Sequence, residues 1–587
     1  MKCPFVERDC LKRDCLGWSN GMCFVESVSS KLEILCNLLS KICADVTSEK
    51  DFRRNLADQP NAQPAPVEKI AGDVDQASET VHVKYSVWEP ISTPKGMKEA
   101  TLAIDFGTAL SKVAVRPRSQ DIAIPIPLGE IASKILYDSG IESFRDDSDN
   151  KYVEDSLVYI DDDANVFCGT LARTTHLRAL ESEITRPAIQ NLKQFLIAGG
   201  VDFSLGNSYF PSFETLNKQD VLATYLAYLF YLSRIFLGNL EKLDVDLAST
   251  LRNFSFPVWE DQDYKNAVKK MMKGAIAKAY CLEMWFKEEL VKGIPLPRLK
   301  EALKEAGQYE ERLEVIFGSE VTEPVAAGYS GVYDVRIEPG LPAQIFIVDV
   351  GAGSTDFALL TVAQPRNQKG LVINTHKQAG VDKGVLMWDN GLRALLRNRL
   401  IETAGVTSGQ PAFKLLNAKL NLSLRTLKER VIASEDGYPI DVNPVLTTPI
   451  RITREELESS KPVQDALSTI RDGFKKYITE VLRTLPKDKF DPALTKLLVT
   501  GGGSFIPSVV ECIRECANIL GPSYPRKVDN QHVPPAYAKI PGIADIYPLI
   551  AVSLGSTEKK YPKERMIEPI APDPGPYEIG GYFTKGV

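Results

Sequence analysis

The alternation of apolar and polar residues predicts strands at three places where an apolar run ends in a glycine-rich turn. The three segments are LAIDFGTALSKVAV at 102–115, IFIVDVGAGSTDFALL at 345–360 and LLVTGGGSFIPSV at 497–509. Between them, short strand-like runs alternate with longer stretches of helical period. This alternation is typical of an α/β protein whose helices cover the faces of its sheets. We therefore predict an α/β fold over residues 99–556.

Two longer stretches are predicted to be helical. The segment 221–237 (VLATYLAYLFYLSRIFL) is apolar enough to be tested as a membrane span. A spanning helix needs about 20 mostly uninterrupted apolar residues. It contains Ser233 and Arg234, and its flanking loops show no asymmetry of positive charge, so we predict a buried helix and no membrane partner. The segment 264–307 is rich in Lys, Ala and Glu and is expected to be mostly helix.

The two ends of the chain differ in character from its middle. Residues 1–44 hold six of the ten cysteines, and apolar residues at helical spacing predict a short amphipathic helix over 27–43. Residues 45–98 are polar and contain several prolines, which indicates a linker. Residues 557–587 are rich in Pro and Gly, and we expect no further domain there.

Length and charge limit the class of protein. A chain of 587 residues implies several domains. The net charge of −7 and the isoelectric point near 5.5 argue against a broad surface for nucleic acid or for an anionic membrane. The N-terminus lacks a basic region followed by an apolar core and a cleavage site, so we expect no signal peptide and a cytoplasmic protein.

The glycine-rich turns carry acidic residues at the ends of the predicted strands. Asp105 ends the first apolar run, and Asp349 and Asp356 flank the second turn. Glycines allow backbone N–H groups to approach an anion closely. Carboxylates can hold Mg²⁺ through its bound water. Together the three turns predict a magnesium and phosphate site between two similar lobes.

Four cysteines near the N-terminus are close enough in sequence to share a metal ion. Six, four and seven residues separate Cys3, Cys10, Cys15 and Cys23. In a cytoplasmic protein such a cluster favours metal binding over disulfides, but the spacing does not match a common zinc finger or ferredoxin. A zinc ion, an iron–sulfur cluster and the absence of a metal all stay open.

The order of the motifs resembles the superfamily of actin, sugar kinases and heat-shock ATPases, and within it the 70-kDa heat-shock (DnaK-like) chaperones. IDFGTALS resembles I-D-x-G-T-T-x-S with Ala109 as a departure, and DVGAGSTD resembles D-x-G-G-G-T-x-D with Ala352 and Ser354 as departures. SEVTEPVAAGYSGVY, from Ser319, resembles the family's hinge helix. GVDKGVLMWDNGL, from Gly380, resembles the opening of the second lobe's helical part. GGGSFIP resembles the adenosine motif.

This resemblance implies a two-lobed, actin-like (ribonuclease-H-like) ATPase fold. Lobe I would span 99–340, and lobe II with its return helix would span 341–556, after the Cys-rich module at 1–44. The resemblance covers only the ATPase half of a heat-shock chaperone, so we expect the peptide-binding domain to be absent. The implied ligands are ATP or ADP with Mg²⁺.

The resemblance also implies catalytic roles for individual residues. Asp105 and Asp349 would orient hydrated Mg²⁺. Asp356, or the hinge glutamate Glu323, would accept a hydrogen bond from the attacking water. Lys193, in NLKQFL, resembles the family's catalytic lysine, whose ammonium stabilises charge on the γ-phosphate.

A further set of residues is expected to contact the nucleotide. The phosphates would lie against Gly107, Thr108, Gly351 and Gly353, with the hydroxyls of Ser354 and Thr355 near the γ-phosphate. The adenosine would lie against Gly502, Gly503, Ser504 and Lys428. Ala109 and Ala352 replace a hydroxyl and a glycine of the family, and we expect slow turnover limited by movement between the lobes.

A chaperone-like ATPase is the function that the resemblance favours. Its nucleotide state would change its affinity for a protein partner or client. Two alternatives stay open: an actin-like filament-forming ATPase, and an iron–sulfur ATPase that activates a partner enzyme. The sequence does not fix the oligomeric state.

Overall fold

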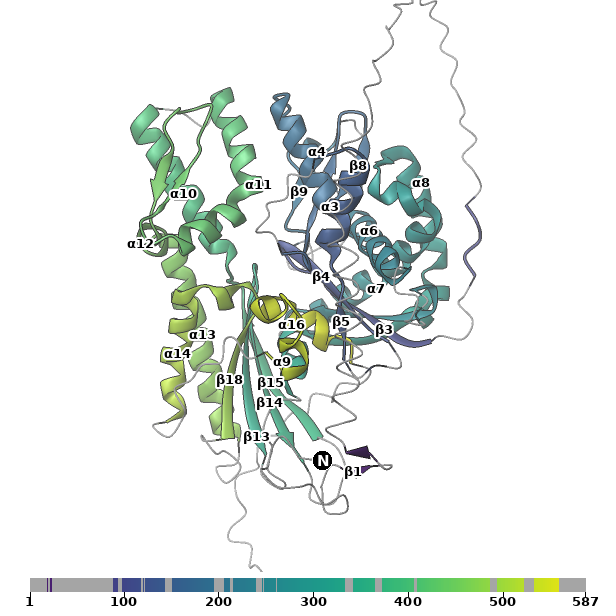
Figure 1. Cartoon of the computed structure of the whole chain (residues 1–587), viewed down its shortest axis with the longest axis vertical. Helices are drawn as coiled ribbons and strands as arrows, with labels where there is room; N and C mark the ends of the chain where they lie inside the picture. Colours follow the sequence, from purple (N-terminus) through teal and green to yellow (C-terminus); the bar gives the residue numbers. More distant parts are fainter. Residues whose placement is uncertain are drawn as a thin grey trace, which may run out of the picture. The chain divides into compact units, whose positions relative to one another are not determined.

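The computed structural model describes most of the chain between residues 88 and 558 (Figure 1). The described residues are 18–19, 22–23, 88–92, 98–117, 120, 122–142, 150–194, 205–211, 215–238, 245, 247–259, 261–332, 342–364, 372–405, 409–485, 494–521 and 533–558. They fall into two compact units. One unit is Met1–Ser86 with Pro535–Ala544, and the other is Val87–Pro534 with Asp545–Val587.

Little of the first unit is described. Its elements are β1 (Trp18–Ser19), β2 (Met22–Cys23) and α15 (Pro535–Ala538), and the two strands pair antiparallel. Cys3, Cys10 and Cys15 lie outside the described residues, as do the expected helix 27–43 and the tail from residue 559. The metal site therefore stays a prediction.

Sheet I, in the second unit, contains the first glycine-rich turn. Its strands lie in the order β12 (Phe317–Thr322), β10 (Thr250–Phe256), β3 (Lys98–Asp105), β4 (Leu110–Arg116) and β5 (Ile124–Pro125), and β6 (Glu154–Asp155) also pairs with β4. Strands β3 and β4 form an antiparallel hairpin, whereas β10 runs parallel to both of its neighbours. Parallel neighbours need long crossovers, which the intervening helices supply.

Sheet II contains the other two turns. Its strands lie in the order β15 (Val372–Val381), β14 (Thr355–Ala363), β13 (Ala343–Val350) and β18 (Thr495–Thr500). Strand β13 forms an antiparallel hairpin with β14 and runs parallel to β18. Every residue of β13 is buried, as its continuous apolar sequence predicts for a strand covered on both faces.

The helices that accompany sheet I come mainly from the segments between its strands. They are α3 (Leu128–Asp138), α4 (Gly169–Glu181), α6 (Lys218–Gly238), α7 (Gln262–Phe286) and α8 (Leu296–Ala306). A small separate sheet has the strand order β11 (Ile294–Pro295), β8 (Asn165–Cys168), β7 (Leu157–Ile160) and β9 (Ile189–Gln190).

The helices that accompany sheet II form one apolar core with it. They are α10 (Leu386–Ala404), α11 (Pro411–Ala433), α12 (Arg454–Glu458), α13 (Lys461–Thr484) and α14 (Pro507–Ala517), with a short hairpin of β16 (Tyr438–Ile440) and β17 (Ile450–Ile452). Figure 1 shows α13 and α14 along one face of the sheet. Within that core Phe357 stacks on Phe474 and Tyr477.

Two closely packed helices join the sheets. Helix α9 (Glu323–Val332) follows β12 of sheet I and packs on β13 and β14, while α16 (Tyr547–Gly555) contacts both β3 and β18. A side chain at Gly555 would place its Cβ 1.7 Å from the carbonyl oxygen of Ala326, so only glycine fits this contact. The Tyr547 hydroxyl donates to Ser330 Oγ at 2.7 Å.

The coarse predictions of the fold are confirmed. The protein is a mixed α/β structure. The segment 264–307 is mostly helix, as α7, a 3₁₀ turn at Lys287–Val291 and α8. Helix α6 is long and apolar enough to cross a membrane by length and composition alone, but 78% of its apolar window is buried within the fold. The prediction of a buried helix is therefore confirmed.

Candidate functional site

Two hairpins of the same form carry the first two glycine-rich turns. In sheet I, β3 ends at Asp105 and the chain returns in β4, where Asp105 lies opposite Lys112. In sheet II, β13 carries Asp349 and the chain returns in β14, where Asp349 lies opposite Asp356. In both hairpins the opposing residue comes seven positions after the first aspartate.

The structure brings the predicted turns together. A Cβ atom at Gly353, in the second turn, would lie 3.0 Å from Thr108 Oγ1 in the first turn. Gly501, which follows β18, has a φ of +77°, and a Cβ there would lie 2.6 Å from Asp349 Oδ1. Turns about 250 and 150 residues apart are therefore in direct proximity, as the sequence predicts.

Buried charges gather beside these turns. The buried carboxyl groups there are those of Asp105, Glu323, Asp349 and Asp356. The ammonium of Lys193 is also buried and forms an ion pair with Glu323, the residue that begins α9. Lys112, which is only partly buried, donates to Asp105 Oδ2 at 3.1 Å. Four carboxyl groups therefore face two ammonium groups among the described residues of this cluster.

The aspartates of sheet II lie where burial and neighbouring carboxyl groups disfavour a negative charge. Burial raises the pKa of Asp349 well above its ordinary value, and the nearby charges of Glu323, Asp356 and Asp105 raise it further. Burial and Glu323 raise the pKa of Asp356 to about 7, although the Val258 N–H and the Ser354 hydroxyl donate to its carboxylate. These two groups are the part of the cluster that a cation would stabilise most.

The same buried charges also shift the pKa values of Lys193 and Glu323. Burial alone would lower the pKa of Lys193, but Glu323, Asp105 and Asp356 outweigh it, and the pKa lies above its ordinary value. Burial raises the pKa of Glu323, while Lys193 opposes that rise. Lys193 therefore keeps its proton at neutral pH and remains a cation inside the cluster.

Backbone contacts hold the turns in place. The Ser156 hydroxyl donates to Gly107 O at 2.9 Å, and the Ser156 N–H donates to Ala109 O. In the second turn, the Gly351 N–H donates to Ser354 O, and the first residues after Gly384 donate to the carbonyls of residues 351 and 352. Hydrogen bonds within the fold thus hold both turns in place.

The two hydroxyls expected near a γ-phosphate already have acceptors. Ser354 Oγ donates to Asp356 Oδ2 at 2.9 Å, and Thr355 Oγ1 donates to Lys383 O at 2.7 Å. Thr355 is fully buried, whereas Ser354 is partly exposed. Of the two, Ser354 is the better placed to turn its hydroxyl toward a ligand.

The residues expected at the adenosine divide into two groups. Gly502, Gly503 and Ser504 form a 3₁₀ turn at Gly502–Phe505 directly after the third strand, and a Cβ at Gly503 would clash with Val350. Lys428, on α11, is buried in an ion pair with Asp389 of α10 at 2.9 Å. Among the described residues, Lys428 forms no hydrogen bond or ion pair with the three turns.

Sequence reasoning missed several residues of this cluster. Lys112, Ser156 and the backbone of Val258 each bind a group of the first or second turn. Phe505, beside Ser504, is 45% exposed although it is a large apolar side chain. The equal seven-residue spacing in the two hairpins could have identified Lys112, but the other contacts join segments remote in sequence.

A second contact joins elements of the two sheets away from the turns. Arg173 of α4 donates to Asp155 at 3.3 Å and to the carbonyl oxygen of Leu422, on α11, at 3.1 Å. Arg425 of α11 lies 4.0 Å from Asp155. Leu422 also packs against the small apolar cluster around Tyr159.

Within the described ranges, no three His, Cys, Asp or Glu side chains are arranged to bind one metal ion. The expectation for Asp105 and Asp349 is different, because it places water between the carboxylates and Mg²⁺. That expectation stays a prediction.

Comparison with protein-family models and with curated proteins found no match. The resemblance to heat-shock ATPases accordingly rests on the motifs alone.

Proposed function

We propose that this protein binds ATP or ADP with Mg²⁺ at the three glycine-rich turns and hydrolyses ATP slowly. One observation carries the proposal: three turns remote in sequence meet at a buried cluster in which carboxylates outnumber ammonium groups. Glycine turns allow backbone N–H groups to approach phosphate oxygens closely. A hydrated divalent cation would offset the excess negative charge and attract the phosphates.

The roles of the side chains follow from their charge. Asp105 and Asp349 would hold the hydrated magnesium ion, which supplies charge neutralisation for the phosphates when bound. Lys193 keeps its proton and would stabilise negative charge on the terminal phosphate. Asp356, with a pKa near 7, is poised to accept a proton from water, and Glu323 positions Lys193.

The fold that we propose for this function is the two-lobed actin-like ATPase. Its support is the repetition of an Asp–glycine-turn hairpin in sheet I and sheet II and the two helices, α9 and α16, that join them. Glu323 begins one of these helices, so a ligand that changes its charge environment would bias the angle between the sheets. If a protein partner binds with an affinity that depends on this angle, the protein acts as a chaperone-like switch.

Calorimetry on the full chain tests the nucleotide proposal. We expect heat of binding from ATP and ADP only when Mg²⁺ is present, and Asp349→Asn should weaken binding on the order of 10- to 100-fold, as loss of a metal's outer-shell ligand does. Asp382→Asn, at an exposed aspartate after β15, is the matched control and should bind as the wild type does. Absence of heat from the wild type with either nucleotide and Mg²⁺ would refute the proposal.

Partner recovery tests the switch. A pulldown with wild-type protein in ATP and in ADP should retain a protein in one state only, and Asp349→Asn should abolish that difference. Equal recovery in both nucleotides, with binding established by calorimetry, would remove the chaperone-like part of the proposal and leave the ATPase part.

A further inference from the structure

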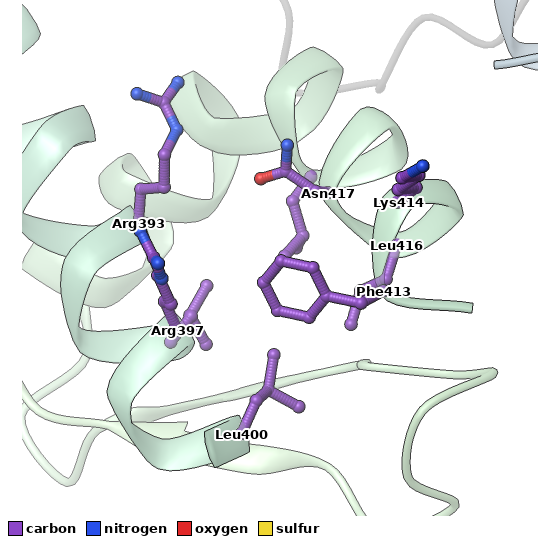
Figure 2. Close-up of a pocket in the computed structure, with 9 residues that line it drawn as sticks. Arg393, Arg397, Leu400, Phe413, Lys414, Leu416 and Asn417 are labelled. Atoms are coloured by element: carbon purple, nitrogen blue, oxygen red, sulfur yellow. The ribbon is translucent and has the colours of Figure 1, made fainter. Parts of the chain in front are cut away.

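A pocket separate from the glycine-rich turns lies between α10 and α11 (Figure 2). Its volume is about 290 Å³, close to the lower end of the range for small-molecule sites, about 300 Å³. Helix α10 lines it with Arg393, Leu396, Arg397 and Leu400, which are spaced three, four and seven residues apart along one helix face.

The floor of the pocket is apolar. Helix α11 contributes Phe413, Leu416 and Leu420, at the same helical spacing as the lining residues of α10. In Figure 2 the Phe413 ring projects from α11 into the space between the helices, with Leu400 beneath it. Each of these side chains is at least nine-tenths buried, so an apolar group in the pocket would be removed from water.

The rim of the pocket is basic. Arg393 and Arg397 lie on α10, and Lys414 and Asn417 lie on α11 (Figure 2). Among the described residues, Arg393 donates to the neutral amide oxygens of Asn390 and Asn421. Within the described part of the chain no acidic residue lines the pocket, and no ion pair is formed by Arg397 or Lys414.

This arrangement contrasts with the rest of the molecule. The chain has a net charge of −7, yet three cations surround one apolar cavity. Cations above an apolar floor, with no acidic residue among the described lining residues, complement a ligand with an anionic head and an apolar body. Arginine and lysine form their strongest hydrogen bonds with such heads.

We propose that the pocket between α10 and α11 binds a small amphipathic anion, a compact hydrophobic body that carries a carboxylate or a similar anionic group. The body fills the space among Leu400, Phe413 and Leu416, and the head binds Arg397 and Lys414. This site goes beyond the proposed nucleotide site and does not depend on it.

Octanoate and octan-1-ol are matched probes for the test, because they share an apolar chain and differ in the charge of the head. Calorimetry on the full chain without nucleotide should detect octanoate binding, with octan-1-ol at least about 10-fold weaker, since a hydrogen bond to a charged group is lost. Equal affinity for the two probes, or no octanoate binding, would overturn the proposal.

Substitutions locate the binding. Arg397→Ala and Lys414→Ala should each weaken octanoate on the order of 10-fold and leave octan-1-ol nearly unchanged. Arg399→Ala is the matched control, because Arg399 lies on the same helix but pairs with Glu456 and does not line the pocket. If Arg399→Ala weakens octanoate as much as Arg397→Ala does, the head does not bind here.

A filling substitution tests the apolar part. Asn417→Phe should fill the cavity and abolish the binding of both probes, and thermal unfolding establishes that the variant is folded. Should Asn417→Phe fail to fold, the two exposed basic positions still decide the matter, because Arg397 and Lys414 are solvent-accessible and their truncation does not disturb the core. Retention of octanoate by a folded Asn417→Phe variant would contradict the proposal.

Discussion

The two Asp–glycine-turn hairpins share a topology but differ in the charge that faces the first aspartate. In sheet I the residue opposite Asp105 is Lys112, so the pair is close to neutral. In sheet II the residue opposite Asp349 is Asp356, so two acids face one another in a buried site. The charges of the sheet I hairpin are therefore balanced without a ligand, whereas the sheet II hairpin needs a proton or a cation to balance its two acids.

The difference shows where a ligand acts on this molecule. Structural pairing in sheet I fixes the first turn, with Ser156 as an additional clamp. In sheet II, burial and the neighbouring carboxyl groups raise the pKa of both Asp349 and Asp356, so their charged forms are disfavoured without a ligand. A site that is costly when empty and neutral when filled favours binding of the group that neutralises it.

The largest effects are expected when the first aspartate of each hairpin is neutralised in turn. Asp349→Asn and Asp105→Asn should both lower ATP turnover, by about 10²- to 10³-fold, as loss of a preorganised charged group at a reaction site does. Their effects on the ligand-free protein should have opposite signs at neutral pH. Asp349→Asn removes a repulsion and raises the unfolding temperature, whereas Asp105→Asn leaves Lys112 without its carboxylate and lowers it.

Phosphate release at saturating Mg²⁺–ATP measures the first effect, and thermal unfolding without ligand measures the second. Asp382→Asn, on the exposed surface, should change neither. Two variants that shift stability in the same direction would show that the hairpins do not differ as described.

A second prediction concerns the contact between the two turns. In Gly353→Ala the new Cβ would lie 3.0 Å from Thr108 Oγ1. Thr108 Oγ1 would therefore have to move by a few tenths of an ångström. We expect nucleotide affinity to fall on the order of 10-fold, because a misplaced cradle loses part of its hydrogen bonding. Gly238→Ala, at the end of α6 and outside the three turns, is the control, since its Cβ would meet no atom within 4 Å.

The double variant Gly353→Ala with Thr108→Ala tests whether the close approach of the new Cβ to Thr108 Oγ1 causes the effect. Removal of the hydroxyl should restore part of the stability that Gly353→Ala loses, and a coupling of about 0.5–3 kcal/mol in denaturant unfolding is typical of residues in contact. Strictly additive effects would mean that the turns do not touch.

Sequence reasoning succeeds where the determinant is local. Asp105 and Asp349 each end an apolar run before a glycine turn, so a dozen consecutive residues contain both the strand and the bend. The burial of α6 is likewise visible in its own composition, because it has almost no polar face.

The parts that sequence reasoning missed are pairings between distant segments. Lys428 binds Asp389 from a neighbouring helix, and no spacing rule connects residues on different helices. The hydroxyl of Thr355 binds the carbonyl of Lys383, a contact created by the fold of the chain after β15. Side-chain identity predicts chemistry, but partner choice depends on tertiary packing.

A third prediction uses the pH dependence of stability. The pKa of Asp356 is about 7 when folded, against an ordinary value of 3.8, so the folded state binds this proton more tightly than the unfolded state does. Stability from this group is therefore complete at pH values below its ordinary pKa and is lost as the pH rises toward and through 7. The unfolding temperature of the ligand-free protein should fall by several degrees between about pH 5 and 8.

Asp356→Asn should flatten this profile, and Mg²⁺ with nucleotide should do the same for the wild type. Thermal unfolding across the pH series, with and without ligand, is the measurement. A profile that rises over this range, or an equal slope in the variant, would contradict the assignment to Asp356.

A fourth prediction makes the hairpin of sheet I resemble that of sheet II. Lys112→Met keeps the length of the side chain and leaves Asp105 without its ammonium partner, which should destabilise the ligand-free protein by roughly 1–3 kcal/mol, the usual cost of an unsatisfied buried polar group. Lys151→Met, at the more exposed pair with Glu130, should cost close to nothing. Mg²⁺ with nucleotide should stabilise Lys112→Met more than it stabilises the wild type, because the first hairpin then also lacks a cation. A ligand-induced stabilisation equal in both proteins would mean that Asp105 and Asp349 do not share one bound cation.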